Sequence, residues 1–383
     1  MGFGLGEPCG RLAHLVPCLL AVLLAAHAAT AQPGPPGITT PTVFPPFDPN
    51  APACTPPPGL EKSLGFAQDN ERDFMMGVRR GLAAAAKDRG LRFQVALGEN
   101  SPSRMVEQVR EFARSHVGGV VAAPVDPLSL APELRRIIWA GAYVGTVVPP
   151  PATELLNAPQ YLTGKVLGDA AAAYIRARLG GRAKVVLLTH DTLQFLAPRF
   201  AAMRDALKGM PGVVIVADIS PATVNKAGGH QMMHTILLAQ PNVDVVLGAD
   251  TVVLGALAAL REVGKARDDQ FLGGIDGEPE AIAEIKKGGP YKASIGLASP
   301  IFAYAMGQHA ADWLEGKSIP QAMDILPTAL TSANIARFED DLADPAPIYA
   351  DPGRRAEYLK MYGNICYDTR DRYVDFPWSS ERK

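Results

Sequence analysis

The sequence lacks the short motifs that mark common hydrolases and redox enzymes. It contains no G-x-S-x-G elbow, no C-x-x-C pair and no H-E-x-x-H helix. Two Gly-Lys pairs end at Lys265 and Lys317, but Ala259 and Ala311 stand where a phosphate-binding loop needs its first glycine. The sequence therefore predicts a protein that is not an enzyme and that needs no cofactor.

An excess of charge of either sign is also missing. The chain carries 37 Lys and Arg against 39 Asp and Glu, which gives a formal net charge of -2 at pH 7. Such a balance gives no long-range attraction to polyanions, so we expect no nucleic-acid partner. A length of 383 residues with 48% apolar residues is enough for two α/β lobes with buried cores.

The first segment has the chemistry of a signal peptide. Arg11 precedes an apolar run over residues 15–26, and small side chains lead up to Ala31. The run is shorter than the about 20 residues of a membrane-spanning helix, and His27 interrupts it. We therefore expect export with cleavage after about Ala31, and residues 1–31 form the predicted signal peptide.

Cysteine is scarce, with only four in the chain. Cleavage would remove Cys9 and Cys18, which leaves Cys54 and Cys366 near the two ends of the mature protein. Two cysteines in an oxidising compartment favour one disulfide, and two free thiols are the alternative.

The rest of the chain divides into a leader, a body and a tail. Residues 32–60 are rich in proline, which resists helix and sheet, and are expected to be an extended leader. From Lys62 short apolar runs alternate with amphipathic stretches, which is typical of βαβ units around parallel sheets. Strands are expected at 64–67, 92–97, 119–123, 143–148, 184–189, 213–217, 244–247, 270–274, 292–296 and 324–330, and helices at 73–89, 103–115, 130–140, 165–178, 197–208, 228–239, 252–263, 281–287 and 300–315. Residues 331–383 are charged and punctuated by proline, so we expect an irregular surface extension.

One pair of histidines has metal-ligand spacing. His230 and His234 lie four apart on a predicted helix, so their imidazoles could share one face. Two nitrogen ligands do not complete a site, and Met233 and Ile236 indicate ordinary packing. We therefore expect no metal.

Several segments of the body together carry a family pattern. They are FMMGVRRG at 74–81, EQV at 107–109, VAAPVD at 121–126, GADTVVLGAL at 248–257 and GIDG at 274–277. In this order and spacing the chain, from Lys62 to about Leu330, resembles the type 1 periplasmic binding proteins, particularly the ribose-binding group of sugar ABC transporters. The resemblance implies two Rossmann-like lobes with parallel sheets, joined by a three-strand hinge. The lobes would comprise residues 61–148 with about 298–330, and residues 149–297.

The resemblance also places a small-molecule ligand between the lobes, at the carboxyl ends of the strands. Polar and aromatic residues follow the predicted strands there, and they are the candidate ligand-binding residues: Gln68, Asp69, Asn70, Asp73, Phe74, His190, Asp191, Gln194, Phe195, Asp250 and Asp276. Asp250 matches the family's acidic ligand contact, and capping of a helix is its alternative role, as it is for Asp73. Phe74 could also be a core residue.

Three segments depart from the sugar-binding pattern. Pro149-Pro150-Pro151 replaces a usual Asp-Arg, Leu162 to Lys165 replaces an Asp-Asn pair, and Leu297-Ala298-Ser299 replaces Gln or Asn. Unsatisfied hydroxyls of a bound sugar would weaken binding by roughly 1 to 3 kcal/mol each. A less polar or cationic ligand is therefore an alternative to a sugar.

The resemblance implies a monomeric binding component that hands its ligand to an ABC permease in the inner membrane. Two other functions remain open. A sensory protein would present the same closed form to a chemoreceptor or kinase, and an exported enzyme could use Asp250 and His190 as acid and base.

Overall fold

The computed structural model describes residues 43–147, 151–190, 193 and 196–381. The predicted signal peptide, its cleavage site and the leader before Val43 lie outside these residues. Within the described part of the chain, no helix combines the length and the apolar character needed to cross a membrane.

The first lobe is built on a seven-stranded sheet. Its strands are β1 (Ser63–Gln68), β2 (Arg92–Leu97), β3 (Gly119–Ala122), β4 (Tyr143–Val147), β5 (Glu154–Asn157), β11 (Ala322–Ile325) and β13 (Leu359–Tyr362). They lie in the order β13-β11-β5-β4-β3-β1-β2, and all neighbours are parallel except β11 and β13. Every residue of β1 and β3 is buried, as expected for central parallel strands covered on both faces.

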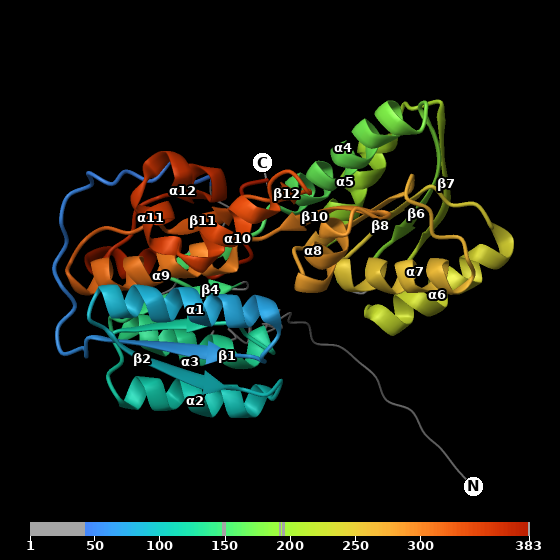
Figure 1. Ribbon diagram of the computed structural model, residues 1–383. Helices are drawn as coiled ribbons and strands as arrows, with labels where there is room; N and C mark the ends of the chain where they lie inside the picture. Colours follow the sequence, from blue (N-terminus) through green and yellow to red (C-terminus); the bar gives the residue numbers. More distant parts are fainter. Residues whose placement is uncertain (1–42, 148–150, 191–192, 194–195, 382–383) are drawn as a thin grey trace, which may run out of the picture. The chain divides into compact units, whose positions relative to one another are not determined.

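Helices cover both faces of this sheet. They are α1 (Asp73–Asp88), α2 (Pro102–Arg114), α3 (Pro127–Trp139) and α9 (Ser299–Leu314). Helices α1 and α9 pack together on one face, while α2 and α3 pack together on the other (Figure 1). The α1–α9 contact is close because Gly81 has no side chain, so its backbone approaches the carbonyl of Pro300.

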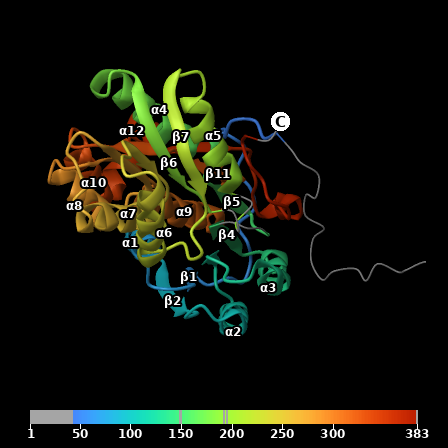
Figure 2. The ribbon, with the colours of Figure 1, turned by 90° about the vertical axis from the view of Figure 1, so that its right-hand side faces the viewer.

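The second lobe is built on a six-stranded sheet. Its strands are β6 (Arg182–Leu188), β7 (Gly212–Ile219), β8 (Val245–Leu247), β9 (Phe271–Asp276), β10 (Tyr291–Gly296) and β12 (Thr328–Leu330). The order is β12-β10-β9-β8-β6-β7, parallel except between β10 and β12, and β7 forms an edge beside β6 (Figure 2). Its helices are α4 (Gln160–Arg178), α5 (Ala197–Leu207), α6 (Lys226–Ala239), α7 (Asp250–Glu262) and α8 (Pro279–Lys286), of which α4 packs on α5 and α6 on α7.

The expected lobe boundaries need two corrections. Residues 154–157 were assigned to the second lobe, but they form β5 of the first sheet. The expected strand 324–330 is two strands in different sheets, because Pro327 between them lacks a backbone donor and ends the pairing. The chain therefore passes between the sheets four times along its described strands, after β5, β10, β11 and β12, and not three times.

The expectation of an irregular tail was wrong. Residues 331–383 contain α10 (Ile335–Ala343), α11 (Pro345–Ala350), α12 (Pro352–Tyr358), strand β13 and the 3-10 helix η2 (Tyr367–Arg372). Pro345 and Pro352 occupy first-turn positions of α11 and α12, where the missing N–H has no partner to lose. The prolines that suggested irregularity in fact begin helices.

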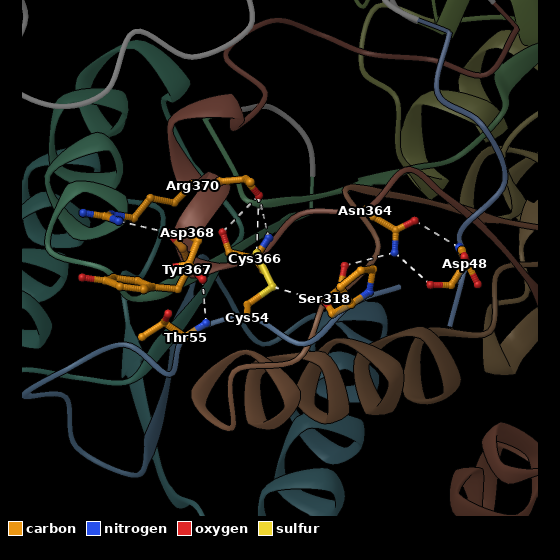
Figure 3. Close-up of a disulfide and its surroundings, with 11 residues drawn as sticks. Asp48, Cys54, Thr55, Ser318, Asn364, Cys366, Tyr367, Asp368 and Arg370 are labelled. Atoms are coloured by element: carbon orange, nitrogen blue, oxygen red, sulfur yellow. Dashed lines mark hydrogen bonds between the residues drawn. A yellow bond between two sulfur atoms is a disulfide. The ribbon is translucent and has the colours of Figure 1, made fainter. Parts of the chain in front are cut away.

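Hydrogen bonds and a disulfide join the leader to this tail. The Phe47 amide donates to the carbonyl of Met361 over 3.0 Å, and the Gly363 amide donates to the carbonyl of Pro45 over 2.7 Å. A disulfide joins Cys54 to Cys366 across a sequence separation of 312 residues, beside a hydrogen bond from the Thr55 amide to Asp368 (Figure 3). The described leader and the tail therefore pack together on the first lobe.

Candidate functional site

The strand orders place a switch point in each sheet. In the first sheet β1 lies between β2 and β3, and in the second sheet β6 lies between β7 and β8. Chain connections leave such a strand in opposite directions, and the crevice at its carboxyl end is the usual ligand site of open α/β sheets. The candidates after Gln68 and after Leu188 follow these two strands.

The loop after β1 is a pre-arranged polar network. Asp69 accepts from the amide and the side-chain Nδ2 of Asn70, over 2.8 and 3.0 Å, and from Nη2 of Arg72 over 3.1 Å. Asn70 Nδ2 also donates to Asn100 Oδ1 over 3.0 Å. The Asp69 carboxylate therefore holds Arg72 and the loop in place. Arg72 and Asn100 belong to this hydrogen-bonded network, and the sequence analysis did not identify them.

Three other candidates of the first lobe have different surroundings. Gln68 is completely buried and donates from Nε2 to the carbonyl of Asn70 over 2.6 Å, while its Oε1 has no hydrogen-bond partner among the described residues. Asp73 is exposed at the first position of α1 and caps nothing, because the N-cap is Arg72. Phe74 is half-buried, with its ring 5.8 Å from the ring of Phe302.

Asp250 does not lie at an accessible surface. Its side chain is 0% exposed, and its carboxylate accepts from Tyr291 Oη over 2.7 Å, Ser294 Oγ over 2.6 Å and the Glu278 amide over 2.9 Å. Burial raises its pKa to about 6 against the lowering effect of these bonds. Asp250 therefore holds the loop at 276–278 through the Glu278 amide, and its direct contact with a ligand stays a prediction. The capping alternative is wrong, because Ala249 is the N-cap.

Asp276 and Arg199 form the charged centre of the second lobe. Asp276 ends β9 with a φ of +117°, a strained conformation for a residue other than glycine, and such strain is concentrated at functional sites. Burial raises the pKa of Asp276, and Arg199 and Arg72 act in the opposite direction. Arg199 is 7% exposed, and burial lowers its pKa while Asp276 raises it.

Two further residues interact with this pair, and the sequence analysis did not identify them. Gln160 Oε1 accepts from Arg199 Nε over 2.9 Å, which fixes the guanidinium. Burial, followed by the charges of Asp250, Asp276 and Asp73, raises the pKa of half-buried Glu278 to about 7. The acidic residue two positions after Asp276 was the available sequence signal for Glu278, whereas nothing in the sequence marks Gln160.

Two of the charges that shift these pKa values belong to the first lobe. Arg72 of the first lobe lowers the pKa of Asp276 of the second, and Asp73 raises the pKa of Glu278. Charged residues that follow β1 therefore act electrostatically on carboxyl groups that follow β9.

The remaining candidates are placed only in part. His190 is half-buried directly after β6, whereas Asp191, Gln194 and Phe195 lie outside the described residues. The comparison of Leu162 to Lys165 with a ligand loop was wrong, because these residues lie inside α4. Pro149 and Pro150 are also outside the described part.

No described cluster offers a free set of metal ligands. His230 and His234 have ring centroids 6.5 Å apart, and His230 Nε2 is 2.7 Å from Glu262 Oε2. Among the described ranges, the group of metal-ligating side chains close enough for a shared ion is Cys54, Cys366 and Asp368, but both sulfurs form the disulfide.

Comparisons with known proteins agree with this architecture. Residues 66–318 match the family model described as periplasmic binding protein domain. The ribose import binding protein RbsB of Bacillus subtilis is 24% identical over 258 residues, which cover 65% of this chain and 80% of that protein. The galactofuranose-binding protein YtfQ of Escherichia coli is 23% identical over 261 residues, which cover 63% and 80%.

Solved structures show the same fold. A periplasmic ribose ABC transporter protein from Conexibacter woesei has a TM-score of 0.62 at 19% identity and covers 73% of this chain and 95% of its own. An ABC transporter solute-binding protein from Bacillus halodurans with bound myo-inositol has a TM-score of 0.62 at 19% identity, covering 73% and 98%. At these identities the likeness concerns the fold of the two lobes.

Proposed function

Since the chain belongs to the family of periplasmic binding proteins, we propose that it is the substrate-binding component of an ABC importer and holds a small polyhydroxylated ligand between its lobes. The family consists of substrate-binding proteins and not of enzymes, and the proposed activity is binding without catalysis. Hinge closure around the ligand would create the surface that the permease recognises.

The observation that carries the proposal is the position of Asp276, which ends β9 at the carboxyl edge of the second sheet with a φ of +117°. The charges of Arg199 and Arg72 act on it by lowering its pKa against the effect of burial. Asp276 accepts hydrogen bonds through its carboxylate, and both arginines donate through planar guanidinium groups. Ligand hydroxyl groups both donate and accept, so they can bridge such groups when the lobes close. Charge-assisted bonds of this kind contribute roughly 1.5–3 kcal/mol each.

The buried Gln68 adds support from the first lobe. Its Oε1 has no partner among the described residues, and a buried polar atom left unpaired costs about 1–3 kcal/mol. A rearrangement on ligand binding that supplies a donor to Gln68 would recover this energy. The relatives named for ribose, galactofuranose and myo-inositol support a sugar or polyol as the ligand class.

A cationic ligand is the second candidate, and Glu278 favours it. Burial and four neighbouring carboxyl groups raise its pKa, so acidic groups dominate the surroundings of Glu278. An amine placed beside Asp276 and Glu278 would relieve this repulsion. An amino sugar would satisfy both sets of groups.

Titration calorimetry with D-ribose, myo-inositol and D-glucosamine tests the proposal. We expect Asp276→Asn to weaken the bound ligand about tenfold or more, because it removes a charge-assisted acceptor. Asparagine tolerates positive φ, which keeps the loop intact. The matched control is Asp268→Asn, an exposed aspartate elsewhere in the second lobe that should bind like the wild type.

The outcomes separate the two ligand classes. Binding of ribose or inositol that Asp276→Asn weakens supports the polyhydroxylated ligand, and binding of glucosamine alone supports the cationic ligand. Failure of all three, or equal binding by Asp276→Asn and the wild type, would contradict the proposed site.

The cellular context is part of the proposal. We infer export by the segment ending at about Ala31, work as a monomer in the periplasm and transfer to an inner-membrane permease, without nucleic acid. N-terminal sequencing of the exported protein and cross-linking of its liganded form in membranes test these points. Capture of a chemoreceptor or kinase in place of a permease would favour the sensory alternative.

A further inference from the structure

A cavity lies in the first lobe. It has a volume of about 460 Å³, within the roughly 300–1,000 Å³ range of small-molecule sites. Its walls come from the leader (46–53), the carboxyl-terminal half of α9, the loop at 317–318 and the tail from Tyr349 to Met361. Among the described residues, none of the candidates for the interlobe site lines it.

The leader and tail build the outer wall. The Asp48 amide donates to Asn364 Oδ1 over 3.1 Å, and Asn364 Nδ2 donates to the Asp48 carbonyl over 2.9 Å (Figure 3). With the Cys54–Cys366 disulfide, these bonds fix both sides of the wall. The cavity therefore depends on two segments outside the family match over residues 66–318.

Two cations that line this cavity, Arg355 and Lys360, have aromatic neighbours. Arg355 lies over the ring of Tyr349, with Cζ 5.1 Å from the centroid, and Nη1 donates to the Tyr349 carbonyl over 2.9 Å. Lys360 Nζ lies 5.3 Å from the ring centroid of Tyr362. In the described part of the chain neither makes an ion pair, whereas Lys317 is paired with Asp312 and Glu315 over 3.0 and 2.8 Å.

The floor of the cavity is a rigid hydrogen-bonded row. Tyr349 Oη lies 3.0 Å from His309 Nε2, and His309 Nδ1 lies 2.8 Å from Glu154 Oε1. Glu154 Oε2 accepts from Tyr143 Oη over 2.7 Å, so each carboxylate oxygen of Glu154 has a buried hydrogen-bond partner. The row orients the ring of Tyr349 without adding a free carboxylate to the cavity.

Apolar groups face these cations. Pro46, Phe47, Pro49 and Met361 line the same cavity. A ligand that fits must therefore pair an anionic head with a flat apolar body. We propose that this cavity is a second binding site, for a small organic anion whose head group contacts Arg355 and Lys360.

Binding of two simple probes, benzoate and phenyl phosphate, tests this site by titration calorimetry and saturation-transfer NMR on the full-length mature protein. Both carry an anionic head on an aromatic ring, and they separate a carboxylate ligand from a phosphate ligand. We expect at least one to bind, and the double variant Arg355→Gln/Lys360→Met to weaken it about tenfold or more. The control Lys265→Met, an exposed lysine of the second lobe, should bind like the wild type.

A second variant tests the location by a different principle. Ala53 is an exposed leader residue on the cavity wall, so Ala53→Trp should fill the cavity without disturbing the core. Loss of probe binding in both variants, with retained binding in Asp276→Asn, supports the site. Absence of binding of both probes to the wild type, or binding that survives both cavity variants, would overturn it; loss in Asp276→Asn alone would assign the probe to the interlobe site.

Discussion

Tyr291 Oη donates a 2.7 Å hydrogen bond to Oδ1 of Asp250, and both side chains are buried to 1% exposure or less. A buried carboxylate is tolerated only when its oxygens are hydrogen-bonded, and Asp250 receives three such bonds. One of them comes from the Glu278 amide, so Asp250 holds the loop that carries Asp276. Asp250 therefore fixes the position of the loop at 276–278.

Tyr291→Phe should destabilise the protein by about 1–3 kcal/mol at pH 7.5, because it removes one donor from a buried charge. Urea unfolding followed by circular dichroism measures this. The matched control is Tyr161→Phe, which removes a 2.9 Å bond to Asp205 between two exposed side chains. The control should change stability by less than about 0.5 kcal/mol, and an equal loss in both variants would contradict the role assigned to Asp250.

Glu278 should make the stability depend on pH. Its folded-state pKa of about 7 is above the ordinary value of 4.5, so the folded protein binds more protons than the unfolded chain between these values. The contribution of Glu278 to the free energy of unfolding is thus most favourable below about pH 4.5 and is lost as the pH rises through about 7.

Glu278→Gln should remove this dependence because glutamine does not titrate. Since the group is half-exposed and screened by solvent, we expect the variant to be more stable than the wild type by on the order of 1 kcal/mol at pH 8. The difference should shrink towards zero at pH 4.5. Unfolding curves at both pH values measure it, with Glu61→Gln, an exposed glutamate of the first lobe, as the control. A gain of equal size at both pH values would contradict the electrostatic explanation.

The disulfide should stabilise the protein by closing a long loop. In the chain-entropy model, Cys54→Ser/Cys366→Ser lowers the free energy of unfolding by up to roughly 5 kcal/mol. The double variant also removes the covalent bond between the leader and the tail. Limited proteolysis should therefore cut residues 43–53 faster than in the wild type. Thr55→Val is the control, because its side chain changes while its amide can still donate to Asp368. Unchanged proteolysis in the cysteine variant would show that hydrogen bonds alone hold the leader.

The sequence predicted most of the two-lobe body because burial on both faces leaves a clear pattern. Central strands such as β1 have an apolar middle and are buried throughout, and helices such as α2 bury apolar residues at a regular helical spacing on one face. The tail was misjudged because Pro345 and Pro352 begin helices as readily as they end them. β5 was missed because four residues beside a run of prolines carry too little periodic signal.

The site was predicted less well than the fold. The sequence correctly placed Asp276 at the end of a strand, because topology decides where a loop lies, and its contact with a ligand stays a prediction. Topology does not decide which of the two carboxylates, Asp250 or Asp276, is buried. Asp250 is internal because Gly274, which has no side chain, leaves room for the Asp250 carboxylate. Arg199 and Gln160 meet from two helices 39 residues apart in sequence, and this contact is a result of packing that no local pattern encodes.

The contact between α1 and α9 gives a last prediction, about the body of the first lobe. A Cβ on Gly81 would lie 2.2 Å from the Pro300 carbonyl and 2.8 Å from the Ala303 Cβ, so the helices would have to move apart. Alanine favours a helix by about 1 kcal/mol over glycine, but overpacking costs typically 1–3 kcal/mol and should prevail. Gly81→Ala should therefore lower the melting temperature, whereas Arg80→Ala on the exposed side of the same turn should leave it nearly unchanged. Because Ser299 at the start of α9 follows the passage from the second sheet, a shift of α9 should also weaken ligand binding in the interlobe site. Calorimetry on the two variants checks both effects, and a Gly81→Ala protein as stable as the wild type would contradict the close packing.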